Sequence, residues 1–165
     1  MINTNNQNNT KESILYNNIL LLSRNKLFYT NFNLLDTFQN RIYLIFLNKS
    51  FIFIKKKSSK NDEDYKIFSQ KLFDLIFRKI ELNMREIGHG DVIANKNMKQ
   101  LVKSFYNILL FCEKFSNETD KSINTFFLKY LKTNSDQKAP KITSLINYFK
   151  KYQNIFFSLN SDSVL

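Results

Sequence analysis

Glycine and proline are almost absent from this chain, and their scarcity restricts the folds that it can adopt. Only two glycines and one proline occur in 165 residues, and both glycines stand in one tripeptide, Gly88-His89-Gly90. Sandwiches and barrels of β-strands need many tight turns, and such turns recruit glycine and proline. We therefore expect an all-α protein in which few turns join long helices.

The chain has enough apolar side chains to build one hydrophobic core. Hydrophobic residues make up 43% of it, including 17 Phe and 8 Tyr, and its length suits a single domain. We expect an irregular bundle of about six helices over residues 11–158. A disordered polar tail is expected at 1–10 and a short C-terminal tail at 159–165. The longest apolar run, 42–54, is too short to span a membrane, because a spanning helix needs about 20 apolar residues.

Hydrophobic spacing divides the chain into these helices. Apolar residues recur at intervals of three and four, the period of a helix with one buried face. The predicted helices cover 11–24, 38–56, 64–87, 96–115, 120–132 and 140–157, with a packed connection at 25–36 and a polar loop at 58–63. The run 38–56 is ambiguous, because its Ile and Phe content is also typical of a strand. Its length favours a buried helix.

Residues with helix-start and helix-stop chemistry stand near these boundaries. The predicted N-caps are Thr10, Asp36 or Thr37, Asn95, and Thr119 or Asp120, and Pro140 is placed to open the last helix. Lys55-Lys56-Lys57 end the second helix, where cations suit the negative end of the dipole. Gly88 and Gly90 are expected to stop the third helix, because glycine readily adopts a left-handed backbone.

The formal net charge of +11 invites a nucleic-acid or membrane partner. The make-up of the charge weakens this interpretation, because 21 of the 25 basic residues are Lys and only four are Arg. Arg makes bidentate phosphate contacts, whereas Lys is a strongly hydrated point charge. The chain is also rich in Asn, Ile and Phe, which AT-rich codons specify. A solvated basic surface and a true anionic partner therefore both stay open.

The side chains of common catalytic sites are scarce. The chain has a single histidine, His89, and a single cysteine, Cys112. A Ser-His-Asp triad would depend on a turn histidine, and the lone cysteine excludes an internal disulfide or a Cys cluster. A metal held by His89, Glu86 and Asp91 would have a sparse ligand set. We expect no enzyme activity, no metal and no other cofactor, and we expect Cys112 to be a buried structural thiol.

The glycine pair lies between two of the most regular predicted helices and allows two interpretations. One is a structural joint, in which Asp91 satisfies N–H groups while Arg85 and Glu86 are solvated. The other is a rigid corner that displays Arg85, Glu86, His89 and Asp91 to a partner.

Four stretches resemble, in order and spacing, the ubiquinol-cytochrome c chaperone family. They are Asp36 to Arg41, Met84 to Asp91 (MREIGHGD), Asn97 to Gln100 and Phe105 to Ile108. The octapeptide is fairly specific, and the resemblance covers about residues 25–115. The chain departs from the family pattern at Asn48, Glu81, His89 and Asn107-Ile108, where the family has His, Asp, Val and Gly-Arg.

The resemblance implies a non-enzymatic assembly chaperone for respiratory complex III. Family members hold newly made cytochrome b near the ribosome and membrane, in mitochondria together with a small partner protein. In a bacterium the chain would then act in the cytoplasm, either free or bound peripherally to the inner membrane. In a eukaryote it would act on the matrix side of the mitochondrial inner membrane. The alternative is a basic helical module that binds RNA or the ribosome without a respiratory client. No DNA partner is expected.

Partner-binding residues are expected around the octapeptide and on the helix that follows it. The candidates are Arg85, Glu86, His89, Asp91, Lys96, Lys99, Lys103 and Arg41. The Lys96, Lys99 and Lys103 face, together with Lys55–Lys57, is the candidate contact with ribosomal RNA or anionic lipid.

Overall fold

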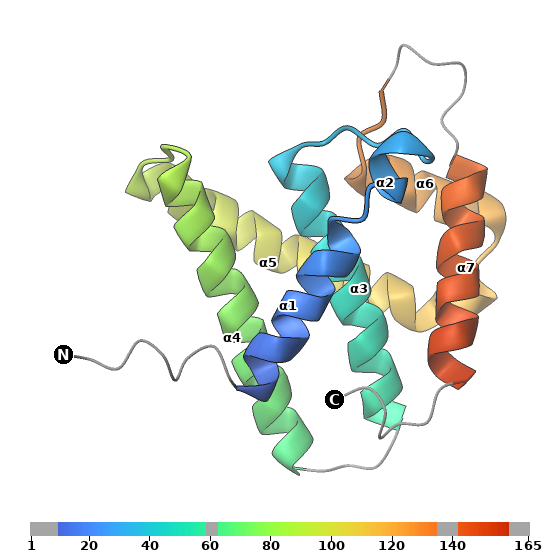
Figure 1. Ribbon diagram of the computed structural model, residues 1–165, viewed down its shortest axis with the longest axis horizontal. Helices are drawn as coiled ribbons and strands as arrows, with labels where there is room; N and C mark the ends of the chain where they lie inside the picture. The colour runs from blue at the N-terminus through green and yellow to red at the C-terminus, as the bar shows by residue number, and fades with distance from the viewer. Residues whose placement is uncertain (1–9, 59–62, 135–141, 159–165) are drawn as a thin grey trace.

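The computed structural model describes residues 10–58, 63–134 and 142–158, which form an irregular helical bundle (Figure 1). Its six main helices are α1 (Lys11–Ser23), α3 (Phe38–Ser58), α4 (Glu63–Glu86), α5 (Asp91–Lys114), α6 (Asp120–Tyr130) and α7 (Ile142–Ser158). A single helical turn, α2 (Leu27–Thr30), follows α1, and a 3-10 turn, η2 (Phe115–Asn117), follows α5. Within the described ranges, β-type pairing is limited to one isolated bridge, Leu34 with Thr133. The predicted all-α class and its six helices are confirmed.

The central helix is α3, and it resolves the ambiguity of the 38–56 run. Helices α1, α5 and α7 pack around it. Its buried apolar residues face in every direction: Ile42, Leu44, Ile45, Phe46, Leu47, Phe51 and Ile52. A helix surrounded by neighbours has no polar face, which explains why its sequence lacks clear helical periodicity. In the described part of the chain, no helix is long and apolar enough to cross a membrane.

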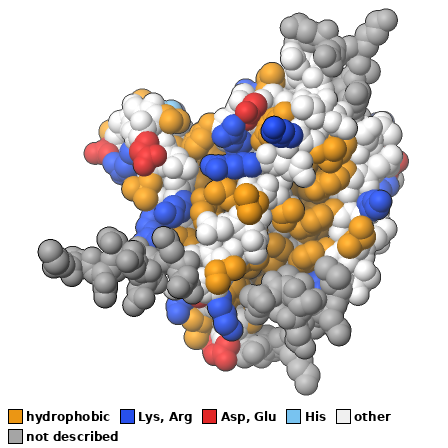
Figure 2. All heavy atoms as spheres, viewed as in Figure 1, with side chains coloured by type: hydrophobic (Ala, Val, Ile, Leu, Met, Phe, Trp, Pro, Cys, Tyr) orange, Lys and Arg blue, Asp and Glu red, His pale blue; other side chains and the backbone are white. Residues whose placement is uncertain are grey.

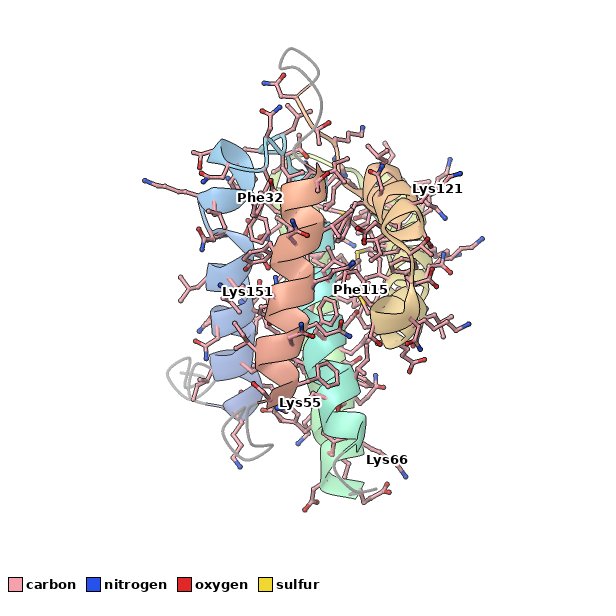
Figure 3. All side chains as sticks on the ribbon, turned by 90° about the vertical axis from the view of Figure 1, so that its right-hand side faces the viewer. Phe32, Lys55, Lys66, Phe115, Lys121 and Lys151 are labelled. Carbon is pink, nitrogen blue, oxygen red and sulfur yellow. The ribbon has the colours of Figure 1, made fainter. Side chains whose placement is uncertain are left out.

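Helix α7 closes one side of the bundle with aromatic rings. It lies across α3, with α1 and α2 on one side and α5 and α6 on the other (Figure 3). Phe149 is fully buried, and its ring centroid lies 5.3–6.1 Å from those of Phe28, Phe51 and Phe127. Such ring pairs add about 0.5–1.5 kcal/mol each beyond their buried area. Figure 2 shows further hydrophobic side chains gathered on the face where α7 flanks α3.

Three of the predicted N-caps are confirmed. The hydroxyls of Thr10 and Thr119 accept hydrogen bonds from the backbone N–H groups of Ser13 (3.2 Å) and Ser122 (3.3 Å). For α3 the cap is Thr37, whose hydroxyl accepts the N–H of Asn40 at 3.2 Å.

The prediction that Asn95 caps the helix after the glycines is wrong. Helix α5 begins at Asp91, and its N-cap is Gly90, with an extended backbone at φ −66° and ψ 161°. Gly88 is left-handed, at φ +93°, so the chain reverses within two residues and the next helix starts at once. Asp91 then lies in the first turn, where the helix dipole favours a carboxylate.

The predicted connection at 25–36 is packed through a buried amide. Asn40, fully buried at the start of α3, donates to the carbonyl oxygens of Leu35 and Lys132 at 2.7 Å each. Its side-chain oxygen accepts the N–H of Lys132 at 2.9 Å. These bonds join the connection before α3 to the segment that follows α6. Residues 1–9 and 159–165 of the predicted tails, 59–62 of the predicted loop, and Pro140 lie outside the described residues.

Candidate functional site: a groove beside the α4–α5 corner

Helices α4 and α5 meet at a sharp corner that projects from the bundle (Figure 1). The chain turns at left-handed Gly88, whose N–H donates to the Arg85 carbonyl at 3.0 Å. The N–H of His89 donates to the Met84 carbonyl, also at 3.0 Å. These bonds satisfy the last carbonyls of α4, as expected where a glycine ends a helix.

Arg85 ties the two helices of the corner together. Its guanidinium donates to the Glu81 carboxylate at 2.8 Å and also binds the Asp91 carboxylate. These hydrogen bonds raise the pKa of Arg85 above its ordinary value. Figure 2 shows acidic and basic side chains side by side on the corner. The geometry favours a structural joint that differs from the predicted one in two respects. Arg85 pairs with two carboxylates, although it was expected to be solvated, and the Asp91 carboxylate binds this side chain, although it was expected to satisfy N–H groups.

A groove lies beside this corner, between the start of α3, the inner side of α5 and the end of α6. Its cavity volume is about 480 Å³. The residues that line it are Phe38, Gln39, Tyr43, Met84, His89, Asn97, Gln100, Leu101, Lys103, Ser104, Asn107, Lys129 and Tyr130.

The groove has one polar wall and one largely apolar wall. Four polar side chains, Asn97, Gln100, Ser104 and Asn107, follow one another along α5 at intervals of three and four. The other wall is largely aromatic, from Phe38 and Tyr43 on α3 and Tyr130 on α6. Such a mixture suits a ligand that offers both apolar side chains and main-chain hydrogen-bonding groups.

Two lysines also line the groove, and none of the described residues in its lining is a carboxylate. Lys103 comes from α5 and Lys129 from α6, and both are exposed. Neither forms an ion pair within the described ranges. His89 completes this end of the groove, with its Nδ1 3.4 Å from the side-chain nitrogen of Asn97. The groove is therefore positively charged.

The eight predicted partner-binding residues do not form one cluster. Only His89 and Lys103 line the groove. Arg85, Glu86 and Asp91 lie on the exposed corner, and Lys96 and Lys99 lie with Lys103 on the exposed face of α5. Arg41 forms a bidentate pair with Asp36, at 2.7 and 2.8 Å.

The expectation that Lys55 belongs to an exposed basic surface is wrong. Lys55 is 5% exposed. Its ammonium donates to the backbone carbonyl oxygen of Phe156 and lies over the aromatic ring of the same residue. Figure 3 shows it beneath the C-terminal end of α7. The apolar stem of a lysine packs well under a helix end, and the ammonium binds a last-turn carbonyl. The side chains of Lys56 and Lys57 lie outside the described structure.

Lys129 and most of the polar wall were not among the residues predicted from the sequence. A signal for the wall was present, because polar residues at 97, 100, 104 and 107 follow helical spacing beside the apolar stripe. No such signal marked Lys129, since only the tertiary fold brings the end of α6 against α3.

Two buried side chains with shifted pKa values, Lys49 and Cys112, lie outside the groove lining. Burial lowers the pKa of Lys49 to about 7, against a smaller opposing influence of the Asp74 carboxylate. Burial also raises the pKa of the Cys112 thiol, which is 1% exposed. A thiol held in its protonated form inside a core is unreactive. Cys112 is thus the buried structural thiol that was predicted.

Comparisons with known proteins place the chain in a family. The model of the ubiquinol-cytochrome c chaperone family matches residues 30–165, a range that contains the whole groove. The crystal structure of the Cbp3 homolog from Brucella abortus has the same fold, with a TM-score of 0.74 at 20% identity, over 91% of this chain and 82% of that one. No curated protein matches the chain. This chain belongs to the ubiquinol-cytochrome c chaperone family.

Proposed function

We propose that this protein is a non-catalytic assembly chaperone of respiratory complex III, and that it binds newly made cytochrome b in the groove beside the α4–α5 corner. The observation that carries the proposal is that the groove adjoins the octapeptide 84–91, the most specific family-like motif of the sequence. Met84 and His89, from that motif, line the groove directly.

The chemistry of the groove suits a segment of a membrane-protein client. Before such a protein is assembled, its apolar side chains are exposed to water, and a largely aromatic wall can cover them. Covering 100 Å² of apolar surface yields about 2.5 kcal/mol. Among the described residues, the lining includes an aromatic wall and a row of amide and hydroxyl side chains, which is the chemistry of a binding groove. We place the encounter at the membrane surface, in the bacterial cytoplasm or the mitochondrial matrix.

Filling the groove tests this proposal. Ser104 is half-buried on the polar wall, and Ser104→Trp would occupy the cavity. The matched control is Asn124→Trp on α6, because Asn124 is exposed and does not line the groove. The tagged wild-type chain and the control should recover cytochrome b from cells in a salt-resistant form, whereas Ser104→Trp should recover little. If both variants recovered equal amounts of cytochrome b, the groove would not be its binding site.

A basic module that binds RNA or the ribosome is the second candidate. Lys96, Lys99 and Lys103 are exposed on one face of α5, and none of them forms an ion pair in the described part of the chain. Binding to phosphates weakens steeply with salt, because it depends on counterion release. Recovery of ribosomal RNA alone, lost at high salt, would favour this candidate over the chaperone.

A further inference from the structure

We propose that the groove binds a short extended segment of the client that carries a carboxylate among apolar side chains. This inference rests on the proposed function and specifies what the groove recognises. It follows from the polar wall of the groove, from its two lysines that have no acidic partner within the described ranges, and from its aromatic wall.

The polar wall has the chemistry and the length to hold an extended main chain. Asn and Gln side chains each offer a donor and an acceptor, which are the groups that a peptide main chain needs. At a rise of 1.5 Å per residue, the row from Asn97 to Asn107 is about 15 Å long. An extended peptide advances by about 3.3 Å per residue, so the row matches about four or five residues.

The two lysines in the groove favour an anionic group on the occupant. Some cations of the molecule have acidic partners within it, namely Arg41 with Asp36, Arg85 with Glu81 and Asp91, and Lys150 with Asp120. Lys103 and Lys129 have no such partner within the described ranges, and they differ from the other unpaired lysines of the surface in lining the same groove. None of the described residues in the groove lining is a carboxylate, and these two lysines come from different helices. A carboxylate between them would gain charge-assisted hydrogen bonds, whereas a basic group would be repelled.

The aromatic wall supplies the remaining contacts. Side chains of an extended segment alternate between its two sides. A carboxylate that points toward Lys103 and Lys129 therefore leaves its neighbours in the sequence free to pack against Phe38 and Tyr43, whereas the Tyr130 ring lies under the Lys129 ammonium, 5.3 Å from its Nζ. The preferred pattern is an acidic residue flanked on both sides by apolar ones.

The test uses two peptides that differ in one charge, acetyl-Leu-Leu-Glu-Leu-Leu-amide and its Gln analogue. They are titrated into the ¹⁵N-labelled full-length protein and followed by NMR. The Glu peptide should shift the amide signals of Asn97, Gln100 and Lys129 and bind roughly tenfold more tightly than the Gln peptide, an effect that shrinks with salt. Equal affinities, or no detectable binding of the Glu peptide at millimolar concentration, would overturn the inference.

Charge reversal supplies the second arm. The K103E/K129E variant should lose the preference for Glu and bind a Lys analogue of the peptide better than wild type does. The control variant K79E/K121E makes the same change in net charge at exposed positions outside the groove, and Lys121 projects away from the bundle (Figure 3). The control variant should keep the preference for the Glu peptide over the Gln peptide. Loss of this preference in both variants would show a general effect of net charge and would contradict the assignment of Lys103 and Lys129. Retained binding of the Gln peptide verifies that K103E/K129E is folded.

The two proposals fail in different ways. If the charge preference is absent but cytochrome b is still recovered at high salt, only the carboxylate assignment is wrong. If the wild-type chain recovers no cytochrome b, the chaperone function itself is wrong, whatever the peptides show.

Discussion

Replacing Lys49 by Met should stabilise the protein, and most strongly at low pH. Lys49 is 1% exposed, and its ammonium has no hydrogen-bond partner in the described structure. The ammonium lies over the faces of Phe73 and Phe105, with Nζ 4.5 and 4.7 Å from their centroids, and 6.0 Å from the centroid of Phe53. Its pKa falls from 10.5 to about 7. At about 1.4 kcal/mol per pKa unit, the protonated form is penalised by roughly 5 kcal/mol.

This penalty is the net cost of the charged form, because a pKa shift includes every interaction of the ammonium, its contacts with the rings among them. A Met side chain keeps the apolar stem and places a sulfur against the same rings. We therefore expect Lys49→Met to raise the free energy of unfolding by about 5 kcal/mol at pH 6.

The gain should fall as the pH rises. Between pH 7 and 10.5 the unfolded chain keeps the proton of Lys49, whereas the folded protein has released it. Because the unfolded state binds more protons in this window, wild-type stability rises with pH by up to about 1.4 kcal/mol per pH unit. The variant lacks this titration, so its advantage should shrink to about 1–2 kcal/mol at pH 9.5.

Urea denaturation followed by circular dichroism at pH 6.0 and 9.5 measures this difference. The control is Lys79→Met, which removes an exposed lysine from α4 and should change stability little at either pH. A gap between wild type and Lys49→Met that stays constant from pH 6.0 to 9.5 would refute a buried amine that loses its proton.

Three further predictions concern the corner, the connection before α3 and the buried thiol. Gly88→Ala should cost about 1–2 kcal/mol in thermal unfolding, because φ is +93°. Gly90→Ser, at φ −66° in an N-cap position that suits Ser, should cost little, and equal losses would contradict a backbone cause. Asn40→Ala removes three hydrogen bonds and should cost about 3 kcal/mol in urea unfolding, and a loss no larger than that of exposed Asn124→Ala would contradict this role. Cys112, 1% exposed, should react with a disulfide reagent only in denaturant, and rapid labelling of the native protein would show that the core opens.

Much of the fold was predictable because it depends on local sequence rules. The helical spacing of apolar residues in α4 and α5 predicted which faces are buried, and the two glycines predicted the corner between these helices. The start of α5 was predicted wrongly, since Asn95 has the chemistry of a cap but Gly90 is already extended. The N-cap position depends on where the chain turns into the next helix, and the left-handed backbone of Gly88 places that turn directly before Gly90.

The candidate site was less predictable because distant segments create it. His89 and Lys103 were identified from the sequence, but Lys129 lines the groove only because α6 ends against the start of α3. The bonds between Asn40 and Lys132 maintain that contact, and helical periodicity carries no information about them. Arg41 and Arg85 were predicted to bind a partner, but in the fold their guanidinium groups bind carboxylates of the protein itself.

The most direct measurement is the amount of assembled complex III in cells that lack this gene, resolved on native gels. The chaperone function predicts that the complex is lost and that the wild-type chain and Asn124→Trp restore it. Ser104→Trp, with its groove filled, should not restore it although the variant accumulates normally. Intact complex III in the deletion strain would contradict the proposed function.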